Sequence, residues 1–323
     1  MSGNKKHPPY RLSVNKSVDR YLLLELIRFA EKHDFLDMDK AEYFSLGGPF
    51  LIDQKIIHSN FPYIKIHSIE SDSNTFERQK RHVFCKNIEL IQKGVSDFIE
   101  QYEFSNPAVF WLDFTHLSKP HLDSLANLVF KLPVGSIVKI TFNGGPPCRP
   151  HEKDQSKAVQ DFRSKYDDYL VSVDFEQLFD EENYHNLLVE MIKNAAAKFQ
   201  KERKVPAYFV CCDVVEYCDT APMMSFSGIL ISPERIDELN SELQKCAFFS
   251  PNRIQAINMP SFSSIERYYI DQKLPSEDME PLFEALGYPL FPNETEPFDK
   301  TKNILRLYAK FWHKYPEFVR IVP

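Results

Sequence analysis

The sequence predicts an α/β protein built on a doubly wound, mostly parallel sheet. Two observations lead to this expectation. Short apolar runs alternate with segments of helical periodicity between residues 41 and 150, which is typical of repeated strand–helix units. One run, residues 108–112 (AVFWL), has no alternation with polar residues, as expected when both faces of a parallel strand are covered. Right-handed crossovers would place the carboxyl ends of such strands along one edge, where ligands bind.

The first half of the chain supplies five strands and the helices between them. A helix is expected over 18–33, where leucines and an isoleucine form an apolar stripe. Strands are expected at 43–46, 64–69, 88–91, 108–112 and 136–142. Helices are expected at 51–58, through 76–83, and from 118 to 132, where Ser118 and Pro120 give a start signal.

The second half is predicted to begin with helices and to continue with a hairpin. Residues 150–203 have helical character, with one helix over 184–200. The apolar runs 207–215 and 224–231 are joined by a short polar connection, which suits an antiparallel pair rather than a crossover. A helix should follow Ser232-Pro233, and helical pieces without strands are expected from about residue 250, including 299–315. The predicted domains are therefore 1–40 (helical), 41–232 (α/β) and 233–323 (helical).

Composition and charge narrow the classes of function. The net charge is −7 and the pI about 5.8, so nucleic acid is not indicated as a partner. The basic residues between 198 and 204 are expected to be the solvated end of a helix. A polar amino terminus predicts no signal peptide, and no apolar run is long enough to cross a membrane. The six cysteines show no metal-binding spacing, so a cytoplasmic protein with reduced thiols is expected; a protein partner or a homo-oligomer stays open.

A pair of glycines marks the predicted ligand site. The chain has only nine glycines, yet Gly47 and Gly48 are adjacent where a predicted strand gives way to a helix. Glu70 closes the second predicted strand. A glycine turn lets a ligand approach the backbone, and a strand-end carboxylate can accept hydrogen bonds from both ribose hydroxyls, so an adenosine site is predicted. The open alternatives are a plain turn and an ion pair of Glu70 with Arg78 or Lys80.

Further polar residues follow the other predicted strands. Ser96 and Asp97 come after the third strand, where a polar side chain could reach an adenine amino group. Asp72 could contact the ligand or simply cap the next helix. The fourth strand ends in Asp113, with Thr115 and His116 just beyond it. Because parallel strands end at one edge, these side chains are expected to lie on the same rim of the sheet.

This arrangement resembles the class I (Rossmann-like) S-adenosylmethionine-dependent methyltransferase superfamily over residues 40–232. The resemblance implies a seven-stranded sheet with one antiparallel strand and S-adenosylmethionine as the cofactor. It implies cofactor contacts at the glycine turn, the ribose carboxylate and the adenine, which fall on Ser45, Gly47, Gly48, Glu70, Asp72, Ser96 and Asp97. It also implies that Asp113, with Thr115 and His116, orients or deprotonates the methyl acceptor.

The glycine motif departs from that of the superfamily. Ser45 stands at its acidic position, and Pro49 and Leu51 stand where further glycines are usual. Pro49 has no N–H to offer, which harms a pyrophosphate site more than a methyl-donor site and disfavours a nicotinamide-dependent dehydrogenase. A non-catalytic interaction protein that kept the fold is the second alternative. The sequence leaves the acceptor unknown.

Overall fold

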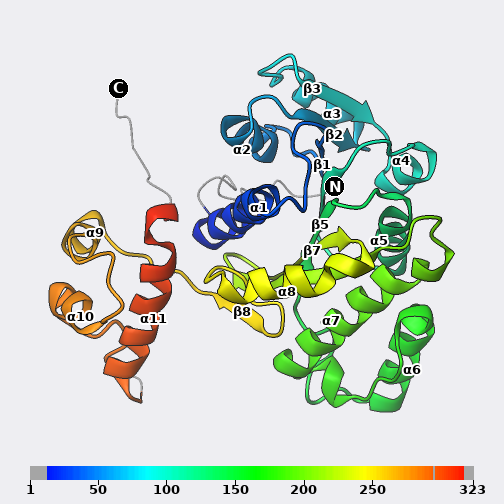
Figure 1. Ribbon diagram of the computed structural model, residues 1–323. Coiled ribbons are helices and arrows are strands. Elements are labelled where there is room, and N and C mark those ends of the chain that lie inside the picture. Colours follow the sequence, from blue (N-terminus) through cyan, green and yellow to red (C-terminus); the bar gives the residue numbers. More distant parts are fainter. Residues whose placement is uncertain (1–12, 294, 316–323) are drawn as a thin grey trace. The chain divides into compact units, whose positions relative to one another are not determined.

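The chain folds around an eight-stranded sheet (Figure 1). The structure is a computed structural model that describes residues 13–293 and 295–315. The strands are β1 (Glu42–Leu46), β2 (Lys65–Glu70), β3 (Ile88–Gln92), β4 (Ala108–Asp113), β5 (Ile137–Asn143), β6 (Tyr208–Cys218), β7 (Pro222–Ile231) and β8 (Ile254–Ile257). Their order is β3-β2-β1-β4-β5-β7-β6-β8. The α/β class is confirmed, but the predicted count of seven strands is wrong.

The sheet is mixed, as predicted. Strands β1 to β5 pair in parallel, and β7 pairs antiparallel with β5. The order reverses at β1, which lies between β2 and β4, so the carboxyl ends of these three strands flank the switch point where ligands bind in open α/β sheets. The extra strand β8 lies in the region expected to be strand-free. It has only four residues, too few to show a period-2 pattern in the sequence.

Helices connect the strands in the predicted alternation. They are α1 (Val14–Lys32), α2 (Ile52–Asn60), α3 (Ser73–Lys80), α4 (Val95–Gln101), α5 (Lys119–Lys131), α6 (Gln155–Tyr166), α7 (Glu181–Ala197), α8 (Ile236–Lys245), α9 (Ser264–Asp271), α10 (Glu280–Leu286) and α11 (Pro297–Phe311). Short 3-10 turns are also present, among them η2 (Asp167–Tyr169). Helix α3 ends at Lys80, earlier than predicted, and α4 was not predicted because seven residues show little periodicity.

One face of the sheet carries the main apolar core. Side chains alternate along a strand, and the register sets Phe110, Phe44 and His67 side by side across β4, β1 and β2. The ring of Phe44 stacks on both neighbours, with centroid distances of 5.4 Å to Phe110 and 4.2 Å to His67. Buried residues of α4, α5 and α7 complete this core.

The opposite face carries buried polar side chains. Ser45, Ser68, Lys139, Thr141 and Ser225 are each at most 2% exposed. Trp111 Nε1 donates to Thr141 Oγ1 at 3.0 Å, and the hydroxyls of Thr141 and Ser225 share a hydrogen bond of 2.8 Å. Burying hydroxyls is costly unless they are paired, so these bonds fix the strands beneath the carboxyl edge.

By its internal contacts the described chain divides into two compact units. The larger one contains residues 22–216 and 221–255, including the strand ends predicted as the site, and the smaller contains 13–21, 217–220, 256–293 and 295–315. The predicted domains 1–40, 41–232 and 233–323 follow sequence pattern rather than compactness, and they stay predictions. Their outermost parts, 1–12 and 316–323, lie outside the described residues.

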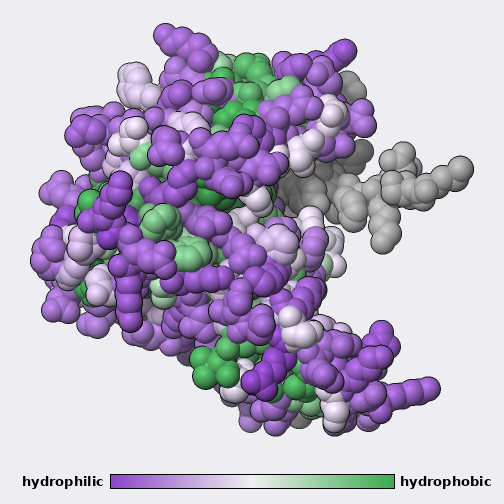
Figure 2. Space-filling view, turned by 90° about the vertical axis from the view of Figure 1, so that its right-hand side faces the viewer, coloured by the Kyte–Doolittle hydropathy of each residue, from purple (hydrophilic) through white to green (hydrophobic). Residues whose placement is uncertain are grey.

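The surface gives few further pointers. Polar and charged residues cover most of the face shown in Figure 2, where hydrophobic residues form only small separate patches. No helix within the described residues is long and apolar enough to cross a membrane. The same part of the chain contains no group of three or more His, Cys, Asp or Glu side chains arranged to hold a metal ion.

Candidate active site

Three of the predicted site residues lie at one level on the carboxyl edge. The amide of Gly47 donates to the carbonyl of Ile69 at 3.0 Å, which places Gly47 beside Glu70 on the neighbouring strand. On its other side β1 pairs with β4, and the match of Ser45 with Trp111 brings Gly47 level with Asp113. The structure therefore brings Glu70, Gly47 and Asp113 together, as expected, while their chemical roles stay predictions.

The glycine turn has one closed side and one open side. A Cβ on Gly47 would lie 2.1 Å from Ser68 Oγ and 2.2 Å from Gln79 Nε2, so any larger residue would have to displace both side chains. A Cβ on Gly48 would meet nothing within 4 Å, and Gly48 is exposed. Position 47 is therefore glycine for packing, whereas the backbone at position 48 is open to a ligand.

Two buried glutamines support the turn from below. Gln54 Nε2 donates to Ser45 Oγ at 2.9 Å and to Ser68 Oγ at 3.3 Å. Gln79 Nε2 donates to the carbonyl of Gly48 at 3.3 Å. Ser45 thus points into this network, which the sequence did not predict. The one signal available was a serine near the carboxyl end of each of the two strands, Ser45 in β1 and Ser68 in β2.

Leu51 makes a bend that usually requires glycine. Its backbone has φ 54° and ψ 41°, in the left-handed region, and it is the residue before α2. For a residue with a side chain this conformation costs about 1–2 kcal/mol. The side chain of Leu51 is fully buried, at 0% exposure, and its burial offsets that cost. The missing glycine at this position therefore does not abolish the turn.

Glu70 and Asp72 are held by backbone amides at the start of α3. Glu70 is half-buried, and its Oε1 accepts a hydrogen bond of 2.8 Å from the amide of Asp72. Burial raises the pKa of Glu70, although the amides of Asp72 and Ser71 act in the opposite direction. Asp72 accepts from the amide of Thr75 at 2.7 Å and is the N-cap of α3, one of the two roles predicted for it.

The suggested ion pair of Glu70 is not formed with either expected partner. Lys80 Nζ lies 2.6 Å from Glu77 Oε1, within α3. The guanidinium of Arg78 lies over the ring of Phe50, 4.8 Å from its centroid. Both cations therefore have other partners in the structure, and the carboxylate of Glu70 keeps acceptor capacity for a ligand.

Ser96 and Asp97 lie in the first turn of α4, after β3. Both are exposed, and the carboxylate of Asp97 lies beside Gly94, the residue before the helix. The hydroxyl of Ser96 is 2.8 Å from that of Ser124 on α5. Ser96 is thus bound to the neighbouring helix, whereas the carboxylate of Asp97 is accessible to solvent beside Gly94.

The loop after β4 carries Thr115 and His116. Both are exposed, and Thr115 Oγ1 is 3.1 Å from His116 Nδ1. The ring of His121 stacks on Phe114 at 3.8 Å, and its Nδ1 lies 2.9 Å from the carbonyl of His116. Burial lowers the pKa of His121, so its neutral ring can donate to that carbonyl. Thr115 and His116 therefore lie, just after Asp113, on a loop that contacts from α5 hold in place.

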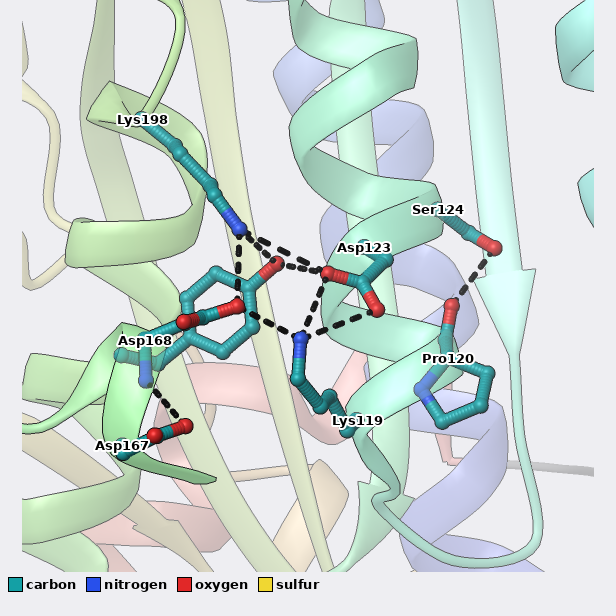
Figure 3. Close-up of polar contacts among 8 residues, drawn as sticks. Lys119, Pro120, Asp123, Ser124, Asp167, Asp168 and Lys198 are labelled. Carbon is teal, nitrogen blue, oxygen red and sulfur yellow. Dashed lines mark hydrogen bonds and ion pairs between the residues drawn. The ribbon is translucent and has the colours of Figure 1, made fainter. Parts of the chain in front are cut away.

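Charged residues fasten the segment around η2 to the start of α5 (Figure 3). Lys119 Nζ lies 2.6 Å from Asp168 Oδ2, and Lys198 Nζ lies 3.3 Å from the same oxygen. The buried Tyr169 donates its hydroxyl to Asp123. Lys198, predicted to be part of a solvated helix end, instead joins this network. The network holds the 166–169 segment against the helix that follows the Thr115–His116 loop.

The loop after β5 contacts a buried histidine. His185, on α7, is 3% exposed; its Nδ1 lies 2.6 Å from Glu216 Oε2 on β6, and its Nε2 lies 3.1 Å from the carbonyl of Gly144. Gly144 has no room for a side chain, because a Cβ there would lie 2.7 Å from Met224 Cγ. No sequence motif pointed to His185, since its two partners are far from it along the chain.

Sequence comparison agrees with this geometry. Residues 8–323 match the protein family described as "Putative O-methyltransferase". The chain belongs to this family. The match and the order of the sheet confirm the resemblance to class I methyltransferases, and a family of O-methyltransferases removes support from the dehydrogenase alternative. No curated protein matches the chain.

Several solved structures show a distant likeness to this O-methyltransferase family member. Trm1 from Pyrococcus horikoshii with S-adenosyl-L-methionine has 13% identity and a TM-score of 0.44, covering 72% of this chain and 58% of that one. LepI with SAM has 14% identity and a TM-score of 0.32, covering 59% of this chain and 43% of LepI. An rRNA methylase from Streptococcus thermophilus has 11% identity and a TM-score of 0.35, covering 67% and 95%. The chain thus spans less than half of LepI, and the family assignment depends on the sequence match alone.

Proposed function

We propose that the protein transfers a methyl group from S-adenosylmethionine to an oxygen atom of its acceptor. The observation that carries this proposal is Glu70, a half-buried carboxylate beside the glycine turn whose Oε1 accepts 2.8 Å from the Asp72 amide. An ionised carboxyl group offers about four acceptor positions, so Glu70 can also accept from the two ribose hydroxyls. Membership of the O-methyltransferase family supports oxygen as the acceptor atom.

The residues around the turn fit the adenosyl part of the cofactor. The exposed backbone of Gly48 faces open space, so a ligand can approach it closely. Asp97, in the first turn of α4, would accept from the adenine amino group, with Ser96 beside it. Asp72 and Ser45 complete the predicted cofactor set, Ser45 acting through Gln54 beneath the turn.

At the reaction centre, bound S-adenosylmethionine would supply an activated methyl carbon. Asp113, at the end of β4, would orient the acceptor hydroxyl and take its proton, while Thr115 and His116 would line the same loop. The bound cofactor would supply the methyl group, with S-adenosylhomocysteine as the leaving group, while Asp113 would hold the proton of the acceptor hydroxyl. Atoms and charge balance without any further reactant.

Calorimetry tests the cofactor step. The wild-type protein should bind S-adenosylmethionine and S-adenosylhomocysteine, and Glu70→Gln should weaken both by roughly 10- to 100-fold, the loss of about 1.5–3 kcal/mol expected for hydrogen bonds to a charged group. Glu77→Gln is the matched control, because Glu77 is exposed on α3 and pairs with Lys80. No heat with either ligand at millimolar concentration would refute the proposal.

Turnover separates an enzyme from the non-catalytic alternative. Formation of S-adenosylhomocysteine is measured with a panel of phenols, alcohols and carboxylic acids. Asp113→Asn should keep cofactor binding and lower turnover by roughly 100-fold or more, the usual contribution of a general base. Cofactor binding with equal, background turnover in both proteins across the panel would favour a binding protein that kept the fold.

A further inference from the structure

Both ring nitrogens of His185 face atoms that can only accept hydrogen bonds. One is the carbonyl oxygen of Gly144, and the other is Oε2 of Glu216. A neutral imidazole has a single N–H, so it could serve one acceptor and would turn a lone pair toward the other. The imidazolium has two N–H groups and satisfies both. For a ring that is 3% exposed, this geometry favours the charged form.

The charges around the ring agree with this assignment. Burial lowers the pKa of His185, but the hydrogen bond and charge of Glu216, the charge of Glu181 and the carbonyl of Gly144 outweigh burial and raise it. Glu181 lies one turn earlier on α7, and Glu216 comes from β6. The side chain of Glu216 is 36% exposed, so water also solvates its negative charge.

The loop held by His185 begins beside the candidate reaction centre. Asp113 pairs with Thr141 in the β4–β5 register, so Asn143 is only two residues further along the neighbouring strand. Asn143 Oδ1 accepts from the amide of Gly145 at 2.9 Å, and the amide of Gly144 donates to the carbonyl of Pro222 at 3.0 Å. The loop after β5 therefore begins on the strand that pairs with β4, close to Asp113.

We propose that His185 is a positioning residue that, as an imidazolium, fastens the loop after β5 to α7 and β6 and so fixes the acceptor side of the site. The two hydrogen bonds of the charged His185 ring follow from the geometry alone. Their importance for an acceptor rests on the proposed methyl transfer. Deprotonation of the His185 ring removes one of these two hydrogen bonds, so the loop after β5 is held less firmly.

Nuclear magnetic resonance of the full chain with 15N-labelled histidine tests the charge. At pH 7 both ring nitrogens of His185, assigned through His185→Gln, should carry protons, and Glu216→Gln should leave only one protonated. His121 is an internal control, since burial lowers its pKa and its ring should be neutral at pH 7. A neutral His185 ring at pH 7 in the wild type would overturn the proposal.

Hydrogen exchange of the loop tests the consequence. The amide of Gly144, corrected for the exchange rate of an unfolded peptide, should exchange roughly 10-fold faster in His185→Asn, whose shorter amide can reach only toward Glu216. His185→Gln can still reach toward Gly144 and should restore most of the protection, without the wild-type dependence on pH. The exposed His151→Gln is the control. Equal protection of the Gly144 amide in the wild type and the three variants would contradict the proposed role of His185. Failure to bind S-adenosylmethionine would instead refute only the proposed function, because neither measurement needs the cofactor.

Discussion

Gly47 and Gly48 are chain neighbours with opposite surroundings, and they give a matched pair of substitutions. Gly47→Ala should lower the free energy of unfolding by about 1–3 kcal/mol, because the methyl group overlaps Ser68 and Gln79. Gly48→Ala should change it by no more than about 0.5 kcal/mol. Urea unfolding measures both. A stable Gly48→Ala protein that no longer binds cofactor would show that the ligand passes close to this backbone; equal destabilisation by both changes would contradict the assignment.

Two substitutions of Leu51 separate the destabilisation caused by its left-handed backbone from the stabilisation contributed by its buried side chain. Leu51→Ala should destabilise by about 2–5 kcal/mol through the lost buried volume. Glycine has no side chain either, but it tolerates φ 54°. Leu51→Gly should therefore be more stable than Leu51→Ala by about 1 kcal/mol, the reverse of the usual order. Thermal unfolding of the two variants measures the difference, and the usual order would contradict a strained backbone here.

The buried His185 makes part of the stability depend on pH. Since its pKa is raised in the folded state, the stabilisation is complete below the ordinary histidine pKa of about 6.5 and is lost as the pH rises through the raised value. The difference in unfolding free energy between wild type and His185→Gln should thus be larger at pH 6 than at pH 9. The other histidines contribute equally to the pH dependence of both proteins, so their contributions cancel in this difference. A difference that grows with pH would contradict the sign.

Sequence reasoning located the strand ends of the site but not the contacts beneath them. Gly47, Glu70 and Asp113 could be found because each follows an apolar run in a fixed order. Gln54 and Gln79 could not, since an isolated glutamine on a helix has no signature until its helix is docked. The same is true of His185 and Glu216, which meet only through tertiary folding.

Arg203 closes the carboxyl end of α5. Its guanidinium donates to the carbonyls of Val129, Phe130 and Leu132, which have no partner within the helix. Arg203→Ala should lower the unfolding free energy by about 1–3 kcal/mol, because it leaves part-buried carbonyls unpaired. Lys201→Ala, at an exposed position nearby, is the control and should stay within about 0.5 kcal/mol. Equal effects in chemical denaturation would show that Arg203 is only a surface charge.

The elements that sequence pattern predicted well are those with long apolar runs. Strands β4 and β5 are buried on both faces. The unbroken apolar run of β4 and the mostly apolar run of β5 identified them. Helix α4 and strand β8 were missed because their seven and four residues complete too few periods to show a pattern. Their type is decided by docking against the sheet rather than by local sequence.

At the scale of the whole molecule, the net charge of −7 predicts weak affinity for bare nucleic acid. A polyanion gains little from a chain of the same sign, since few phosphate counterions are released. The full chain should therefore not retard a random DNA or RNA duplex in a mobility-shift assay at about 0.1 M salt. Retardation that weakens steeply with added salt would reveal a local basic surface and would widen the range of acceptors to test.

The hydrogen bonds of Gln54 and Gln79 beneath the glycine turn affect how related sequences can be recognised. A search pattern that requires regularly spaced glycines would not find this chain. Its left-handed backbone conformation is at Leu51, and its turn is supported by the side-chain amides of Gln54 and Gln79. A search pattern that requires Gly47, Gln54, Ser68 and Gln79 together would describe this turn better than glycine spacing does.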